Sequence, residues 1–204
     1  MPKTSSSPVV IAPDLSAYFE EVLTGAIRAR RVDATDEAAT YLVAMLAHFA
    51  HPTEPVAAAL TRPLTFQLRD AMEAPSAERF QRLRSLGDHV LYVLGFFGGH
   101  LESKVDRGYV VGVGATAYLN AAAMLRVRDE REARRGVLSE LATKFDRFVA
   151  VLRDIADGTL ACGAQSERTI VRLYERWLAT GSTRLAEELG AHGILAHKTP
   201  IGLA

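Results

Sequence analysis

Residues 108–123 constrain the fold most, because they combine a helix-compatible pattern with very small side chains. Small residues at a contact let two helix axes come closer together than bulky ones do. In a helix, one face of this segment would carry Gly108, Gly112, Ala115, Leu119 and Ala122. We therefore predict a helix that packs tightly at the centre of the molecule, with this face against a neighbour.

The preceding residues, 76–94, predict a long amphipathic helix as that neighbour. Ser76 follows Pro75 and is well placed to cap the first turn. Apolar residues then recur every three or four positions, which is the spacing of one helix face. This stripe consists of Phe80, Leu83, Val90, Leu94 and Phe97. We expect the sequence GFFGGH at residues 95–100 to form a tight turn between the two helices.

The rest of the chain also predicts helices, and no segment shows the alternating pattern of a strand. A clear helical pattern begins at Val137, and we expect Gly158 to end that helix. The sequence thus predicts an all-α protein, a single irregular helical bundle of about seven to eight helices. The bundle would span residues 13–190, between a flexible N-terminal tail at 1–12 and a C-terminal tail at 191–204.

Composition argues against several classes of protein. The chain has 204 residues, which suits one domain, and 24 basic residues balance 24 acidic ones. Such a balance gives no reason to expect nucleic acid or an anionic membrane as a partner. Cys162 is the single cysteine, so an internal disulfide and a multi-thiolate metal site are excluded. With no apolar run of membrane-spanning or signal-peptide type, we expect a cytoplasmic protein.

A polar line on the helix at residues 76–94 is the most unusual feature of the sequence. Together with tyrosines of the next helix, it suggests a ligand-binding pocket lined by Ser85, Asp88, His89, Tyr92, Tyr109 and Tyr118. Alternatively, Asp88 is buried for a structural reason and accepts a hydrogen bond from Tyr109, Tyr118 or a backbone N–H. We favour this second interpretation, because most buried polar groups are satisfied in this way.

Catalysis by Asp88 or His89 is a third interpretation, in which one of them acts as a base. Sequence neighbours point about 100° apart on a helix, so these two side chains would not face each other. We therefore assign no catalytic residue. A test of this reading is whether Asp88 lies in a solvent-connected cleft or in a dry core.

Two weaker patterns concern metals and nucleotides. His48 and His51 share a helix face, and His89 and His100 could complete a metal site, but no E-x-x-H pair accompanies them. The sequence YVVGVGATAY, with a strand at residues 109–111, resembles a dinucleotide-binding fingerprint, which requires a βαβ unit that the chain does not otherwise predict. We expect neither a metal nor another cofactor.

Several short patterns together resemble a family of all-helical bacterial cytosolic proteins without an assigned activity. They are Gly87-Asp88, Leu91, Gly95-Phe96-Phe97, Tyr109, Gly114, Ala117-Tyr118 and LYERWLATGS at residues 173–182. The resemblance covers roughly residues 76–190. It implies a helical fold and a bacterial cytosolic origin, and it transfers no site residue.

The functional prediction is a non-enzymatic bacterial interaction or regulatory protein. Small-residue helix faces and amphipathic segments offer contact surfaces, so we expect a homo-oligomer such as a homodimer, or a further protein partner. The alternative is a helical bundle that binds a small molecule or cofactor, metal or haem included, in a pocket near Asp88. Neither a membrane nor a nucleic acid is expected as a partner.

Overall fold

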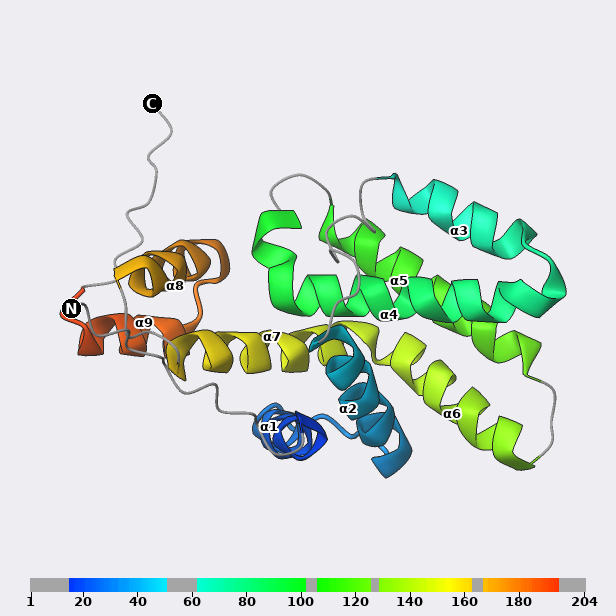
Figure 1. Cartoon of the computed structure of the whole chain (residues 1–204), viewed down its shortest axis with the longest axis horizontal. Coiled ribbons are helices and arrows are strands. Elements are labelled where there is room, and N and C mark those ends of the chain that lie inside the picture. Colours follow the sequence, from blue (N-terminus) through cyan, green and yellow to red (C-terminus); the bar gives the residue numbers. More distant parts are fainter. Residues whose placement is uncertain (1–14, 51–61, 102–105, 126–128, 163–166, 195–204) are drawn as a thin grey trace, which may run out of the picture.

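The computed structural model describes residues 15–50, 62–101, 106–125, 129–162 and 167–194 (Figure 1). Within these ranges every regular element is an α-helix, so the predicted all-α class is confirmed. The helices are α1 (Leu15–Ala29), α2 (Asp36–Ala50), α3 (Leu64–Glu73), α4 (Ser76–Leu101), α5 (Arg107–Met124), α6 (Asp129–Thr143), α7 (Phe145–Cys162), α8 (Glu167–Thr180) and α9 (Thr183–Ala191). The described residues thus form nine helices, slightly more than predicted.

The helix that was predicted to begin at Val137 is in fact two helices, which meet at Lys144. The side chain of Lys144 donates a hydrogen bond to the backbone carbonyl of Asp33, in the segment before α2. The break lets α6 pack against α2 and α5, while α7 follows α4 and α1. The bend at Lys144 therefore brings α6 beside α2.

The long helix α4 is the centre of the fold and packs along α5 and α7 (Figure 1). Helix α3 covers α4 and α5, and α1 packs against α2 and α7. Fully buried side chains of α4, α5 and α7 meet in the core between them. They include Leu83, Leu91, Leu94, Tyr118, Phe148 and Leu152. The predicted helix at the centre of the molecule is present as α5.

The packed face of α5 is not the face predicted, although Ala122 of the predicted face is buried. Leu119 is 51% exposed, and a Cβ added to Gly112 would meet nothing within 4 Å. Gly114 and Ala117 face inward instead, and a Cβ on Gly114 would lie 2.3 Å from Cζ of Phe145. The small size of Gly114 is therefore what lets the Phe145 ring approach α5.

The predicted turn at residues 95–100 is wrong, because α4 continues to Leu101. A Cβ on Gly95 would lie only 2.4 Å from Cβ of Leu152. Gly95 therefore permits the close approach of α4 to α7 and does not end the helix. The prediction that Gly158 ends its helix is also wrong, because α7 continues to Cys162. A Cβ on Gly158 would lie 3.0 Å from the Arg184 guanidinium, so this glycine too lies at a helix contact.

Helices α8 and α9 form a second, smaller hydrophobic cluster at the C-terminal end of α7 (Figure 1). Its buried members are Ala161, Leu173, Trp177, Leu185 and Leu189. Arg176 joins this cluster to the core. Its Nε donates to Asp157 at 2.5 Å, and its Nη atoms donate to the backbone carbonyls of Gly95 and Phe96.

The predicted tail at residues 1–12 lies outside the described residues, as do residues 195–204 of the predicted C-terminal tail. None of the described helices is both long and apolar enough to cross a lipid bilayer.

Candidate functional site

Asp88 is the centre of a hydrogen-bond network that joins three helices. Its Oδ1 accepts a hydrogen bond from the hydroxyl of Tyr41 on α2 at 2.6 Å and from the hydroxyl of Tyr118 on α5 at 2.8 Å. The bond from Tyr118 is one that the sequence predicts. Tyr41 was missed, although it lies three residues after the buried Ala38 and four before the buried Met45, so helical spacing places it on the inner side of α2.

Burial raises the pKa of Asp88, whereas the hydrogen bonds from Tyr41 and Tyr118 and the charge of Arg84 act to lower it, and the net shift is upward. Burial also raises the pKa of both tyrosines, and the negative charge of Asp88 adds to that effect. Both hydroxyls therefore keep their protons at neutral pH and serve as donors to the carboxylate. This arrangement fixes the positions of α2, α4 and α5 relative to one another.

Arg84 lies one helical turn before Asp88 on the same side of α4. Its Nε atom is buried, and within the part of the chain that the structure describes it has no hydrogen-bond partner. Because a buried donor without an acceptor is costly, such groups are uncommon in folded proteins. Among the described residues, the Nε of Arg84 is thus a buried donor without an acceptor.

A pocket of about 530 Å³ opens beside this network, between α2, α4 and α6. Its less exposed walls come from Tyr41, Phe80, Arg84, Val137 and Leu138. Its exposed rim comes from Asp36, Glu37, Thr40 and Gln81. The wall is mainly apolar, and Arg84 and the Tyr41 hydroxyl are its polar exceptions.

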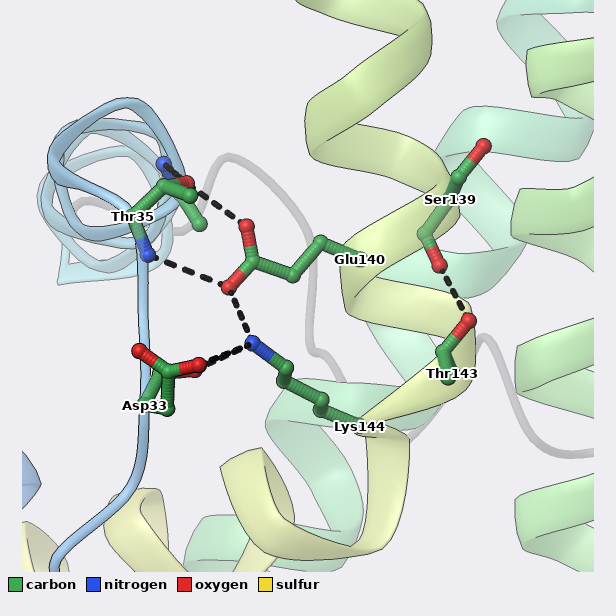
Figure 2. Close-up of polar contacts among 7 residues, drawn as sticks. Asp33, Thr35, Ser139, Glu140, Thr143 and Lys144 are labelled. Carbon is green, nitrogen blue, oxygen red and sulfur yellow. Dashed lines mark hydrogen bonds and ion pairs between the residues drawn. The ribbon is translucent and has the colours of Figure 1, made fainter.

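A polar junction fixes the α2 end of this pocket against α6 (Figure 2). The Thr35 hydroxyl caps α2 by accepting from the Ala38 N–H at 3.2 Å. The Glu140 carboxylate on α6 accepts from the Thr35 hydroxyl at 2.6 Å and from the Thr35 N–H at 3.1 Å. Lys144 donates to Glu140 at 3.1 Å, so the first turn of α2 is tied to the α6 surface that lines the pocket.

The electrostatics of Glu140 agree with this role. Burial raises the pKa of Glu140, but the hydrogen bonds from Thr35 and Lys144 outweigh burial, and the net shift is downward. The carboxylate is therefore ionised at neutral pH, when it accepts both bonds from Thr35.

The other residues of the predicted pocket lie in different surroundings. Ser85 and His89 line a separate cavity of about 480 Å³ beside α3, where His89 Nδ1 lies 2.7 Å from the Ser85 carbonyl oxygen. Tyr92 is stacked between Phe49 and Phe96, with ring centroids 4.5 and 4.7 Å away. The structure therefore keeps Ser85 with His89 and places Tyr92 in an aromatic stack.

Tyr109 lies at the start of α5, where it is 40% exposed. Its hydroxyl accepts from the Thr65 N–H of α3 at 3.0 Å and does not take part in the network of Asp88. Among the predicted pocket residues, the described hydrogen bonds join Asp88 to Tyr118 and Ser85 to His89, and they do not connect these two pairs. None of the residues that line the pocket between α2, α4 and α6 is among the site residues that the sequence predicted.

The described residues do not show the geometry that either of the two weaker sequence patterns requires. Residues 109–111 form the first turns of α5, so the fingerprint-like sequence lacks its strand. Among the described residues, no group of three or more His, Cys, Asp or Glu side chains is arranged to hold a metal ion. His51 and the side chain of His100 lie outside the described part of the chain.

Comparisons of the chain with models of protein families, with curated proteins and with solved structures gave no match in any of the three. The chemistry of the pocket and of its surroundings is therefore the basis for assigning a function.

Proposed function

We propose that the chain is a small-molecule-binding helical protein, and that the pocket between α2, α4 and α6 is its binding site. The pocket itself carries the proposal. Its volume of about 530 Å³ falls in the range of ~300–1,000 Å³ that is typical of ligand sites. Its wall combines the apolar Phe80, Val137 and Leu138 with a few polar groups, which is the usual composition of such sites.

The surroundings of the pocket support binding by a preformed site. The Tyr41 hydroxyl is held by Asp88, and Glu140 holds the first turn of α2 against α6. Hydrogen bonds close to the pocket thus tie α2 to both of the other helices that line it. A site that is already ordered loses less conformational entropy when a ligand binds.

Substitution of Thr40 by Trp tests this proposal. Thr40 is an exposed rim residue, so a large side chain there would obstruct the pocket without disturbing the core. The probe is the neutral dye N-phenyl-1-naphthylamine, whose fluorescence rises in apolar surroundings. We expect the wild-type protein to enhance the fluorescence and Thr40→Trp to lose most of that enhancement.

Thr143→Trp is the matched control. Thr143 is also exposed, and its hydroxyl donates to the Ser139 carbonyl at 2.8 Å, as the Thr40 hydroxyl donates to the Asp36 carbonyl at 2.8 Å. Each substitution therefore removes the same kind of local hydrogen bond, but only Thr40 lies at the rim. Absence of dye binding to the wild type, or equal binding to Thr40→Trp, would refute the proposal.

A second candidate function is self-association through the outward face of α5. Tyr109 and Leu119 are 40% and 51% exposed, and Gly112 between them has open space in front of it. An exposed apolar face with a small residue in its middle permits close approach of a second helix. Light scattering on the eluted peak of a size-exclusion column tests this candidate. We expect Leu119→Glu to convert an oligomer to a monomer, and a monomeric wild type would refute self-association.

A further inference from the structure

The positive charge of Arg84 restricts what the pocket can bind. Arg84 lines the less exposed side of the pocket, and its buried Nε has no acceptor among the described residues. An arginine side chain remains charged under all ordinary conditions. A ligand with a negatively charged group would therefore pair with a guanidinium whose charge lines the pocket.

The acidic residues near Arg84 do not fill this role. Asp88 accepts hydrogen bonds from two tyrosine hydroxyls and acts on Arg84 through charge without a hydrogen bond to its Nε. Asp36 and Glu37 lie on the exposed rim, in the first turn of α2, where acidic side chains complement the helix dipole. Within the described residues, none of these carboxylates therefore supplies an acceptor to the Nε of Arg84.

The rest of the pocket limits the ligand further. A guanidinium presents its N–H groups as a planar fork, which matches the two oxygens of a carboxylate. Phe80, Val137 and Leu138 offer an apolar surface beside it. The carboxylates of Asp36 and Glu37 at the rim would repel a second negative charge, which disfavours a dianion such as a phosphate ester.

We propose that the pocket binds a monocarboxylic acid with an apolar body, the carboxylate paired with Arg84 and the body lying along Phe80, Val137 and Leu138. This inference rests on the proposed function of the same pocket. It adds the chemical class of the ligand and identifies Arg84 as the residue that selects it.

Displacement of N-phenyl-1-naphthylamine by octanoate and by octanamide tests the inference. The two competitors have the same chain length and differ in the charge of the head group. We expect octanoate to displace the dye from the wild-type protein at a concentration on the order of ten-fold lower than octanamide, because a charge-assisted pair is stronger than a neutral hydrogen bond. This comparison needs no substitution, so it does not depend on whether a variant folds.

Substitution of Arg84 then assigns the effect. Arg84→Met keeps the unbranched stem of the side chain without the guanidinium and its charge, and should make the two competitors equal. Arg84→Lys keeps the charge without the fork, and should retain part of the preference for octanoate. The control is Arg82→Met, because Arg82 is exposed on α4, pairs with Glu78 at 2.7 Å and lines the other cavity. It should leave the preference unchanged.

The outcomes separate the inference from the proposed function. Suppose that Thr40→Trp excludes the dye but octanoate has no advantage over octanamide, or does not displace the dye. The carboxylate inference is then wrong, and the proposed binding pocket is not affected. If the preference for octanoate persists in Arg84→Met, the carboxylate does not pair with Arg84 and the inference falls as well. If the wild-type protein does not bind the dye, both fall together.

Discussion

Replacement of Gly114 by Ala is the most direct test of how α5 packs. The added methyl carbon would lie 2.3 Å from Cζ of Phe145, 2.8 Å from its Cε2 and 2.9 Å from Cγ1 of Val90. Phe145 is 2% exposed and Val90 is 1% exposed, so neither side chain can swing out into solvent. Gly112, on the same helix, has nothing within 4 Å of its missing Cβ and is the matched control.

The difference between the two variants isolates the packing energy. Each substitution gains helix propensity of about 1 kcal/mol, because alanine is the better helix former. Gly112→Ala should therefore stabilise the protein by about 0.5–1 kcal/mol. Gly114→Ala carries the same gain but adds an overpacking cost of about 1–3 kcal/mol, and a 2.3 Å approach favours the upper end of this range. We expect Gly114→Ala to be the less stable variant by about 1–3 kcal/mol.

Urea unfolding, followed by far-ultraviolet circular dichroism, measures this difference from the transition midpoints, provided that the slopes of the transitions agree. A second substitution, Phe145→Leu, removes the end of the ring that the methyl group meets. It should destabilise Gly114→Ala less than it destabilises the wild type, which a double-mutant cycle detects. If Gly114→Ala proves as stable as Gly112→Ala, α5 does not pack through the face that carries Gly114, and the reasoning is refuted.

Three further predictions concern the polar contacts between helices. Asp88→Ala should cost about 1–3 kcal/mol for each tyrosine hydroxyl, of Tyr41 and Tyr118, that loses its acceptor. Because burial raises the folded-state pKa of Asp88 above its unfolded value, its contribution to stability is fully present below the unfolded pKa and is lost as pH rises through the folded pKa. Asp88→Asn keeps an acceptor but does not titrate, so urea unfolding across the acidic range should show no such loss of stability with rising pH. A pH dependence equal to that of the wild type would contradict the raised pKa of Asp88. Arg176→Met should leave Asp157 without its partner at a cost of about 3–5 kcal/mol and speed amide exchange in α8 and α9. Equally faster amide exchange in α4 and α5 would contradict a role of Arg176 that is limited to α8 and α9.

Helix positions were predictable from sequence because apolar spacing is a local property of the chain. The spacing of Leu83 and Val90 identifies α4 without knowledge of any other segment. The roles of the glycines were not predictable in this way. Gly95 was read as part of a turn, but it faces Leu152, which lies far along the chain. A glycine at a turn and a glycine at a helix crossing look the same in a sequence.

The same limit explains the wrong face of α5. Gly112 and Gly114 are both small, and the bulky side chain that needs the room, Phe145, lies on α7. The choice of face is made by that partner and not by α5. Side-chain size alone therefore predicts that a helix is closely packed, but it does not predict which side of the helix is packed.

The sequence predicted only those parts of the candidate site that depend on one helix and the next along the chain. Asp88 was identified because it belongs to a polar line on α4, and its partner Tyr118 lies on the following helix. The pocket needs Val137 and Leu138 of α6, which reach α2 because the chain bends at Lys144. No local pattern in the sequence predicts that bend. In the structure, the backbone N–H of Lys144 still donates to the Glu140 carbonyl, as it would in a continuous helix.

Tyr41 belongs both to the network and to the pocket, and this double position connects stability to binding. Its hydroxyl is a donor to Asp88 at 2.6 Å, and its side chain lines the cavity beside Arg84. The hydrogen bond limits the orientations of the ring, so the wall that a ligand would meet is set before the ligand arrives. Arg84, by contrast, has a buried Nε without an acceptor among the described residues. The described hydrogen bonds therefore hold the wall of the pocket in place, and the charge of Arg84 in that wall is left for the proposed ligand.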